Sequence, residues 1–126
     1  MKQRILTFSI TALPKLIQLG GLSISDVKCQ ADEYHGARKS EIMYPIDFLE
    51  RTFSIHNYNY GCSIVAAWRG SGIYLCHEEP EVITIDSREL GRLAHEGSRA
   101  CWTRSFIAEV RTAENITVRL ERPMGI

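Results

Sequence analysis

The sequence predicts an α+β domain in which about six strands form a split or highly curved sheet with two to three short helices. Three observations favour this class. The chain has 126 residues, the length of one domain, and 44% of them are hydrophobic, enough for one continuous core. Apolar runs typical of strands cluster in the second half of the chain. The helical patterns do not alternate regularly with these runs, which disfavours a doubly wound parallel sheet. We expect residues 1–126 to form a single domain.

The first predicted element is a strand over residues 4–10 (RILTFSI), in which Phe8 and Ile10 alternate with polar positions. A short helix is predicted to follow it. Thr11 can cap this helix, and Pro14 is tolerated because the first helical turn has no hydrogen bond to lose. The apolar residues recur at helical spacing, and the pair Gly20-Gly21 is predicted to end the helix in a left-handed cap.

The middle of the chain contains one predicted helix between two irregular stretches. Residues 25–40 are polar and lack periodicity. Pro45 is predicted to begin the helix PIDFLERTF, with Ile46, Leu49 and Phe53 on one side. The following HNYNYG is typical of a loop.

The second half contains most of the predicted strands. CSIVAAW and IYLC form a hairpin signal around RGSG, and VITID is a further strand. Ser87 is predicted to cap the helix SRELGRLAHEG, which carries Leu90, Leu93 and Ala94 on one face and ends at Gly97. Two more strands, CWTRSFIAEV and NITVRLER, complete the chain.

Charge and cysteine usage narrow the class of protein. Fifteen basic and fifteen acidic residues balance, which disfavours salt-driven binding to nucleic acid, and no apolar run approaches the length of a membrane span. We therefore expect no membrane partner. The four cysteines lack the close spacing of a zinc site or a disulfide framework. Three of them (Cys62, Cys76 and Cys101) lie in apolar contexts, where a free thiol is a small buried hydrophobe, and this favours a reducing, cytoplasmic location.

Local motifs for common chemistries are missing from the sequence. No two of the four histidines lie four residues apart, as zinc-protease ligands do, so no metal site is predicted. Arg69-Gly70-Ser71-Gly72 lies between two strands rather than before a helix, which indicates a turn and not a phosphate loop. Cysteine–histidine catalysis stays open as an alternative, because Cys76 directly precedes His77 and spacing does not decide the question.

Three short segments resemble one known family. The strand ending in Phe8-Ser9-Ile10-Thr11, followed by LPKLIQLGG, is similar to the start of ADP-ribosyltransferases, and most of all to toxins that attach ADP-ribose to thymidine in single-stranded DNA. In that family the corner has a histidine where this chain has Ser9. The segment around Glu109 (FIAEV, then Glu114-Asn115-Ile116) resembles the family's late strand with its catalytic glutamate.

The resemblance implies an enzyme that uses NAD as a substrate to modify a macromolecule, either protein or nucleic acid. It implies Glu109 as the catalytic carboxylate, because a carboxylate at the ribose stabilises the cation-like sugar formed when the nicotinamide bond breaks. Ser9 and Thr11 would form the NAD corner; in a second register, YHGA, His35 would do so. Arg51, in SEIMYPIDFLER, and Tyr74 would support the ligand.

A rival hypothesis from another class is a non-enzymatic interaction protein, such as a small inhibitor that blocks a larger complex. Tyr58, Tyr60 and Trp68, with the surrounding arginines, would then lie at a partner surface, because aromatic residues and arginine anchor interfaces. A small nucleic-acid-binding domain with the same aromatic residues exposed is a third alternative. The sequence leaves the oligomeric state open.

Overall fold

The structure, a computed structural model, describes residues 15–123. In chain order its elements are β1 (Lys15–Ile17), β2 (Ile24–Ala31), β3 (Ala37–Arg38), α2 (Lys39–Arg51), β4 (Ile55–Tyr58), β5 (Gly61–Trp68), β6 (Ser71–His77), β7 (Ile83–Asp86), α3 (Ser87–Ala100), β8 (Ser105–Thr112) and β9 (Ile116–Glu121). The α+β class is confirmed, with more strands than expected.

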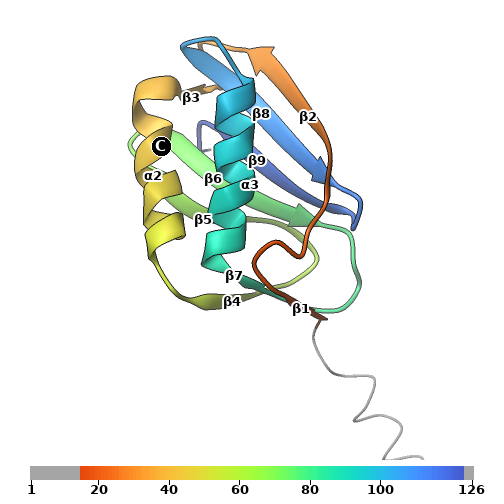
Figure 1. Cartoon of the computed structure of the whole chain (residues 1–126). Helices are drawn as coiled ribbons and strands as arrows, with labels where there is room; N and C mark the ends of the chain where they lie inside the picture. Colours follow the sequence, from red (N-terminus) through yellow and green to blue (C-terminus); the bar gives the residue numbers. More distant parts are fainter. Residues whose placement is uncertain (1–14, 124–126) are drawn as a thin grey trace, which may run out of the picture.

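The strands form two separate sheets, which confirms the split-sheet prediction. The smaller sheet has the order β1-β7-β4, with β1 parallel and β4 antiparallel to β7. The larger sheet has the antiparallel order β2-β8-β9-β6-β5, and the short β3 also pairs with β8. Figure 1 shows α2 and α3 side by side across one face of the larger sheet.

The core lies between these two helices and the larger sheet. Alternate residues of β8 and β9 point toward the helices and are buried, namely Phe106, Ala108, Val110, Ile116, Val118 and Leu120. The helix α3 buries Leu90, Leu93 and Ala94 against them, as its periodicity predicts. The intervening strand residues, such as Glu109 and Arg111, point to the other face. Among the described elements, helices cover only one face of this sheet.

The predicted helix after Thr11 is wrong where the structure describes it. Residues 15–17 are a strand, β1, in which Ile17 pairs with Ile85 of β7 and is buried. Parallel pairing with a buried strand outweighs the weak helical pattern of a short segment. The glycines form a turn instead of a helix cap: Gly21 N–H donates to the Gln18 carbonyl, and Gly20 has a φ of 78°. The predicted strand over residues 4–10 lies outside the described residues.

The second helix, α2, begins at Lys39 rather than at Pro45. The buried side chains Ile42, Ile46 and Leu49 recur at helical spacing through the whole segment, so burial of this stripe carries the helix past the proline. The ring of Pro45 is itself buried within the core-facing side. Packing therefore compensates for the backbone hydrogen bond that a proline inside a helix removes.

Two segments predicted to be irregular contain strands. Within residues 25–40 the chain forms most of β2, and the predicted loop HNYNYG contains the last three residues of β4. Seven of the eight residues of β2 are exposed, so the strand lacks the apolar alternation by which strands are recognised. Its antiparallel pairing with β8 holds it in place.

The later elements agree with the prediction, with shifts at helix ends. The β5–β6 hairpin, β7, β8 and β9 all form, although β8 begins only at Ser105. Asp86, and not Ser87, caps α3, because its carboxylate accepts the Arg88 backbone N–H. The helix continues past Gly97 to Ala100. Gly97 lies inside it at a close contact with the sheet, where an added Cβ would approach Val110 Cγ2 to 2.8 Å.

All four cysteines are paired, which corrects the prediction of free buried thiols. Cys29 of β2 is bonded to Cys101 at the end of α3, and Cys62 of β5 is bonded to Cys76 of β6. The first pair joins residues 72 positions apart, and the second joins cross-strand neighbours of the β5–β6 hairpin that are 14 positions apart, so neither pair has the close spacing on which the prediction relied. Disulfides persist mainly in oxidising compartments, so the argument for a cytoplasmic location no longer holds. Neither α2 nor α3 is long and apolar enough to cross a membrane.

Candidate functional site

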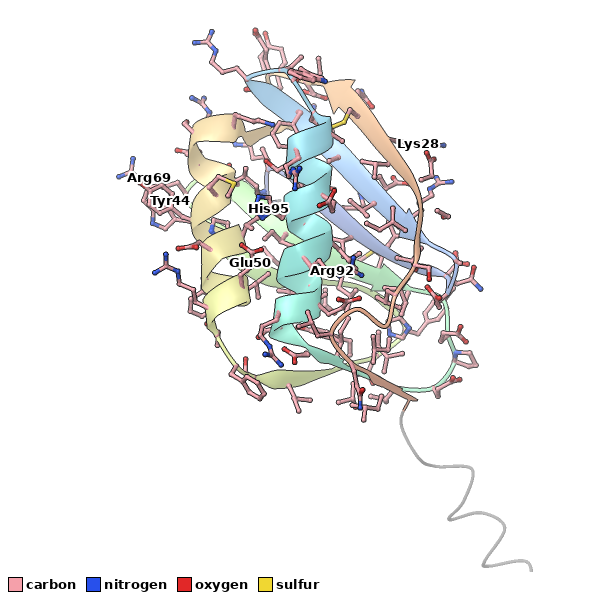
Figure 2. All side chains as sticks on the ribbon, viewed as in Figure 1. Lys28, Tyr44, Glu50, Arg69, Arg92 and His95 are labelled. Carbon is pink, nitrogen blue, oxygen red and sulfur yellow. A yellow bond between two sulfur atoms is a disulfide. The ribbon has the colours of Figure 1, made fainter. Side chains whose placement is uncertain are left out.

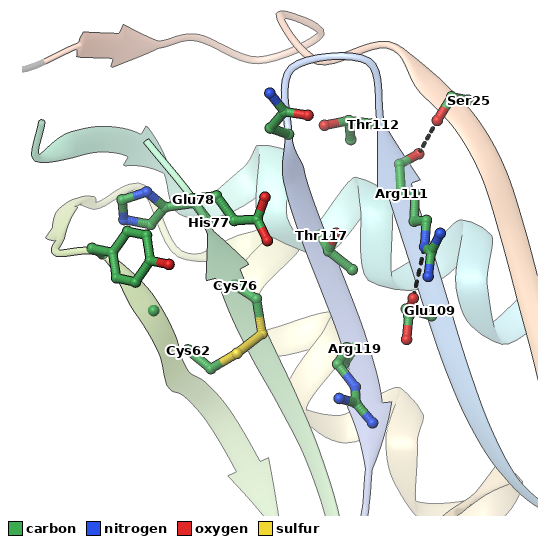
Figure 3. A pocket seen from close by; sticks show the side chains of 13 residues that line it. Ser25, Cys62, Cys76, His77, Glu78, Glu109, Arg111, Thr112, Thr117 and Arg119 are labelled. Atoms are coloured by element: carbon green, nitrogen blue, oxygen red, sulfur yellow. Dashed lines mark hydrogen bonds and ion pairs between the residues drawn. A yellow bond between two sulfur atoms is a disulfide. The ribbon is translucent and has the colours of Figure 1, made fainter. Parts of the chain in front are cut away.

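Two surface features of the described residues combine chemistry with shape. The first is a polar hollow of about 550 Å³ on the open face of the larger sheet. Figure 3 shows the side chains of β6, β9 and β8 that line it, with the Cys62–Cys76 disulfide at one side. Its cations and acids belong to cross-strand rows: Lys28 pairs with Glu109, Glu109 with Arg119, and Arg119 with Tyr74.

The charges in the polar hollow largely neutralise one another. Arg111 Nε donates to Glu109 Oε1 at 2.7 Å, and Arg119 Nε lies 2.9 Å from Glu121 Oε1. Lys28 and Arg119 flank Glu109 on the neighbouring strands. Glu109 is thus a carboxylate surrounded by cationic side chains on an open sheet face, and such an arrangement also occurs on solvated antiparallel sheets.

The structure brings together only some of the residues predicted for an NAD site. Tyr74 shares a face and a cross-strand row with Glu109, on the far side of Arg119. His35 lies in the turn after β2, where its Nδ1 is 3.4 Å from Asp32 Oδ2. It does not line the polar hollow. Ser9 and Thr11 lie outside the described residues.

Arg51 also lies apart from Glu109. It ends α2, on the helical layer that covers the opposite face of the sheet, and its guanidinium pairs with Asp47 one turn earlier. The Asp32 carboxylate beside His35 has a turn-forming role: it accepts the backbone N–H groups of Tyr34 and His35. The His35 N–H bond is the main reason that the pKa of Asp32 is lowered.

The second feature is an apolar groove of about 310 Å³ between α2 and β5. We call it the aromatic groove and define it by the residues that line it, Tyr44, Pro45, Phe48, Ala66, Ala67 and Trp68. Tyr44 and Phe48 are one helical turn apart on α2 and are 58% and 60% exposed. Their apolar area is therefore in water in the isolated chain.

An aromatic and cationic stack lies at one end of the aromatic groove. The ring centroids of Tyr44 and Trp68 are 4.2 Å apart, and the Arg69 guanidinium lies 4.4 Å from the Trp68 ring. Figure 2 shows Tyr44 and Arg69 next to each other on the outer side of α2. Cation–π contact holds the arginine over the tryptophan and leaves its hydrogen-bond donors available.

Local backbone contacts hold this stack in position. Arg38 N–H, at the start of α2, donates to Ser71 Oγ at 2.9 Å, which ties the tip of the β5–β6 hairpin to the helix. Arg69 occupies that tip with a φ of 54°, in the left-handed region. A non-glycine residue there costs of order 1 kcal/mol, and such strain concentrates at functional positions.

The sequence reasoning found part of this surface. Trp68, a predicted partner contact, lines the aromatic groove. The other two predicted contacts do not: Tyr60 lines the polar hollow, and Tyr58 is half-buried with its pKa raised by burial. Tyr44 and Phe48 were missed. Their spacing of four residues, opposite the buried stripe of α2, is the signal that could have revealed them.

Within residues 15–123, no group of three or more histidine, cysteine, aspartate or glutamate side chains is arranged to hold a metal ion. A comparison with models of known protein families and with curated proteins finds no match for the chain.

Proposed function

We propose that this chain is a non-enzymatic binding protein that blocks a site on a partner protein, and that the aromatic groove is its contact surface. The observation that carries the proposal is the surface stack in which half-buried Trp68 lies between Tyr44 and Arg69, beside the exposed ring of Phe48. Tryptophan, tyrosine and arginine are the residues that dominate binding energy at protein interfaces.

The stack also supports the proposal through its rigidity. Tyr44 lies on a helix, and Trp68 lies on a strand that a disulfide and a hairpin join to the rest of the sheet. Side chains already held in one arrangement lose less conformational freedom when a partner binds. A prearranged aromatic surface therefore favours a tight, specific contact over transient encounters.

ADP-ribosyl transfer from NAD stays a prediction. Glu109 is engaged by Arg111, and neither His35 nor Arg51 lies beside it. The polar hollow consequently offers less support for an NAD site than the aromatic groove offers for a protein partner.

The test compares capture of a partner by three forms of the full chain. Wild type, the double variant Tyr44→Ala/Trp68→Ala and the control Trp102→Ala are immobilised and exposed to extract from cells that produce the chain. Trp102 is 94% exposed and lies outside the aromatic groove, so it controls for loss of a surface tryptophan. Circular dichroism confirms that each variant is folded.

We expect one protein to be retained by wild type and by Trp102→Ala and lost by the double variant. If the double variant retains the partner as well as wild type does, the proposal is refuted. A rise in melting temperature with NAD that Glu109→Gln abolishes would also refute it, because a ligand stabilises only the folded state that binds it. That second result would restore the transferase hypothesis.

A further inference from the structure

The two edges of the larger sheet differ in how they are protected. The edge strand β2 carries the charged residues Asp26 and Lys28, whereas β5 at the other edge reads GCSIVAAW, with no charge and no proline. Natural proteins protect sheet edges with charges, prolines, bulges or short strands, because an unprotected edge pairs with other chains. The eight-residue β5 has one such device, a bulge between Ile64 and Ala66.

Backbone groups of β5 face away from the sheet. The Cα atoms of Cys62 and Cys76 are 4.0 Å apart, the narrow spacing of a pair that exchanges no ladder hydrogen bonds. The N–H and C=O of Cys62 therefore point away from β6, and by alternation those of Ile64 do the same. No strand among the described residues pairs with β5 on that side. These donors and acceptors lie on the strand that also forms one wall of the aromatic groove.

The charge beside this edge favours an acidic partner. Arg69 directly follows β5, and among the ion pairs of residues 15–123 none involves its guanidinium, which stacks on Trp68. An arginine with its donors available at the end of an unpaired strand is suited to receive a carboxylate.

We propose that the partner contributes an extended segment that adds to β5 as a further strand, placing an apolar side chain in the aromatic groove and a carboxylate at Arg69. This inference rests on the proposed function and specifies the partner's chemistry. Main-chain hydrogen bonds to Cys62 and Ile64 supply affinity. Because side chains alternate along a strand, every second residue of the segment faces the α2 side, where the aromatic groove selects for apolar groups.

Peptide selection on the full chain tests the inference. A library of short random peptides displayed on phage is selected on immobilised wild type, after removal of phage that bind Tyr44→Ala/Trp68→Ala. The most enriched peptide is synthesised with a fluorescein label, and its affinity is measured by fluorescence polarisation. We expect enriched sequences with apolar residues at alternate positions and an aspartate or glutamate near one end.

Backbone N-methylation of that peptide isolates the strand pairing without altering the protein. Two forms are made, each methylated at alternate amides. We expect the form whose methylated amides face β5 to lose about tenfold or more in affinity, since several backbone hydrogen bonds disappear, and the other form to bind nearly as well as the parent. In the protein, Ile64→Pro removes an N–H that faces away from β6 and should weaken binding, whereas Ile64→Ala keeps that N–H.

The outcomes separate this inference from the proposed function. No enriched peptide, or equal binding of both methylated forms, overturns strand addition, while the aromatic groove remains a partner surface if cellular capture still depends on Tyr44 and Trp68. Partner capture that is unchanged in Tyr44→Ala/Trp68→Ala refutes the proposed function itself. Light scattering that shows a dimer dependent on Ile64 would place a second copy of the chain on β5, which also overturns the inference.

Discussion

Replacing Glu89 by glutamine perturbs the most deeply buried carboxylate among the described residues. Glu89 lies in the first turn of α3 with 0% of its surface exposed. Its two oxygens accept the backbone N–H of Gly20 at 2.7 Å and of Leu22 at 3.0 Å, and both also accept from Arg92, at 2.7 and 2.8 Å. This carboxylate therefore fixes the turn between β1 and β2 to α3.

The size of the effect follows from these contacts. Glutamine keeps the side-chain volume but loses the charge and turns an amide group toward N–H donors. Removing one partner of a buried ion pair costs about 3–5 kcal/mol. Because Arg92 is 36% exposed and can be hydrated, we expect the lower end, about 3 kcal/mol, or a fall in Tm of about 10 °C.

Chemical denaturation followed by circular dichroism measures this loss, with Glu96→Gln as the matched control. Glu96 is on the same helix, but its ion pair with Arg99 is exposed and 3.5 Å long, so its loss should cost less than about 1 kcal/mol. If Glu89→Gln costs no more than Glu96→Gln, the turn does not depend on the buried carboxylate and the reasoning fails.

The pH dependence supplies an independent check. Burial alone would raise the pKa of Glu89, but hydrogen bonds from Arg92, Gly20 and Leu22 outweigh it, so the pKa lies below the ordinary 4.5. A lowered folded-state pKa means that the stabilisation is present above the unfolded pKa and disappears as pH falls through the folded one. The stability difference between wild type and Glu89→Gln should therefore narrow as the pH falls below about 4.5.

Three further changes have expected outcomes. Replacing both cysteines of the Cys29–Cys101 pair by serine should lower the free energy of unfolding by about 4 kcal/mol, and the same change in the Cys62–Cys76 pair by about 3 kcal/mol. The first loss is larger because its disulfide closes a loop of 72 residues rather than 14. Denaturant titration measures both losses, and the reverse order would contradict this loop-entropy argument. Gly97→Ala should lower Tm although alanine favours a helix more than glycine does, because the new Cβ would lie 2.8 Å from Val110 Cγ2. A raised Tm would show that Val110 moves aside at little cost and would contradict this prediction. Arg69→Asn should leave stability within about 1 kcal/mol, because asparagine tolerates positive φ, yet weaken partner capture; unchanged capture would remove Arg69 from the proposed contact.

Periodic apolar patterns explain where sequence reasoning succeeded. In α3, Leu90, Leu93 and Ala94 recur at helical spacing and are all buried, and in the β5–β6 hairpin two apolar runs flank a tight turn. Such elements bury one face against the core of the protein, so the spacing of apolar residues within the element predicts which side chains are buried. The α+β class followed from the order of these elements, whereas two strands of the smaller sheet, β1 and β4, lie in segments predicted to be a helix and a loop.

Elements stabilised by distant partners could not be predicted in the same way. The strand β2 is nearly all exposed and is stabilised by its backbone pairing with β8, and β1 is stabilised by its pairing with β7. The disulfide between Cys29 and Cys101 joins residues 72 positions apart. None of these partners lies within the local window on which periodicity and propensity depend.

The candidate site shows the same division. The sequence alone places Trp68 and Arg69 at the end of an apolar strand, but it begins the helix at Pro45 and so leaves Tyr44 outside it. The three-dimensional packing places Tyr44 and Phe48 of α2 beside that strand at a free sheet edge, and it places Glu109 among cations on the opposite face of the sheet. Composition and spacing specify which faces of an element are apolar, whereas the neighbours of each face depend on how all the elements pack together.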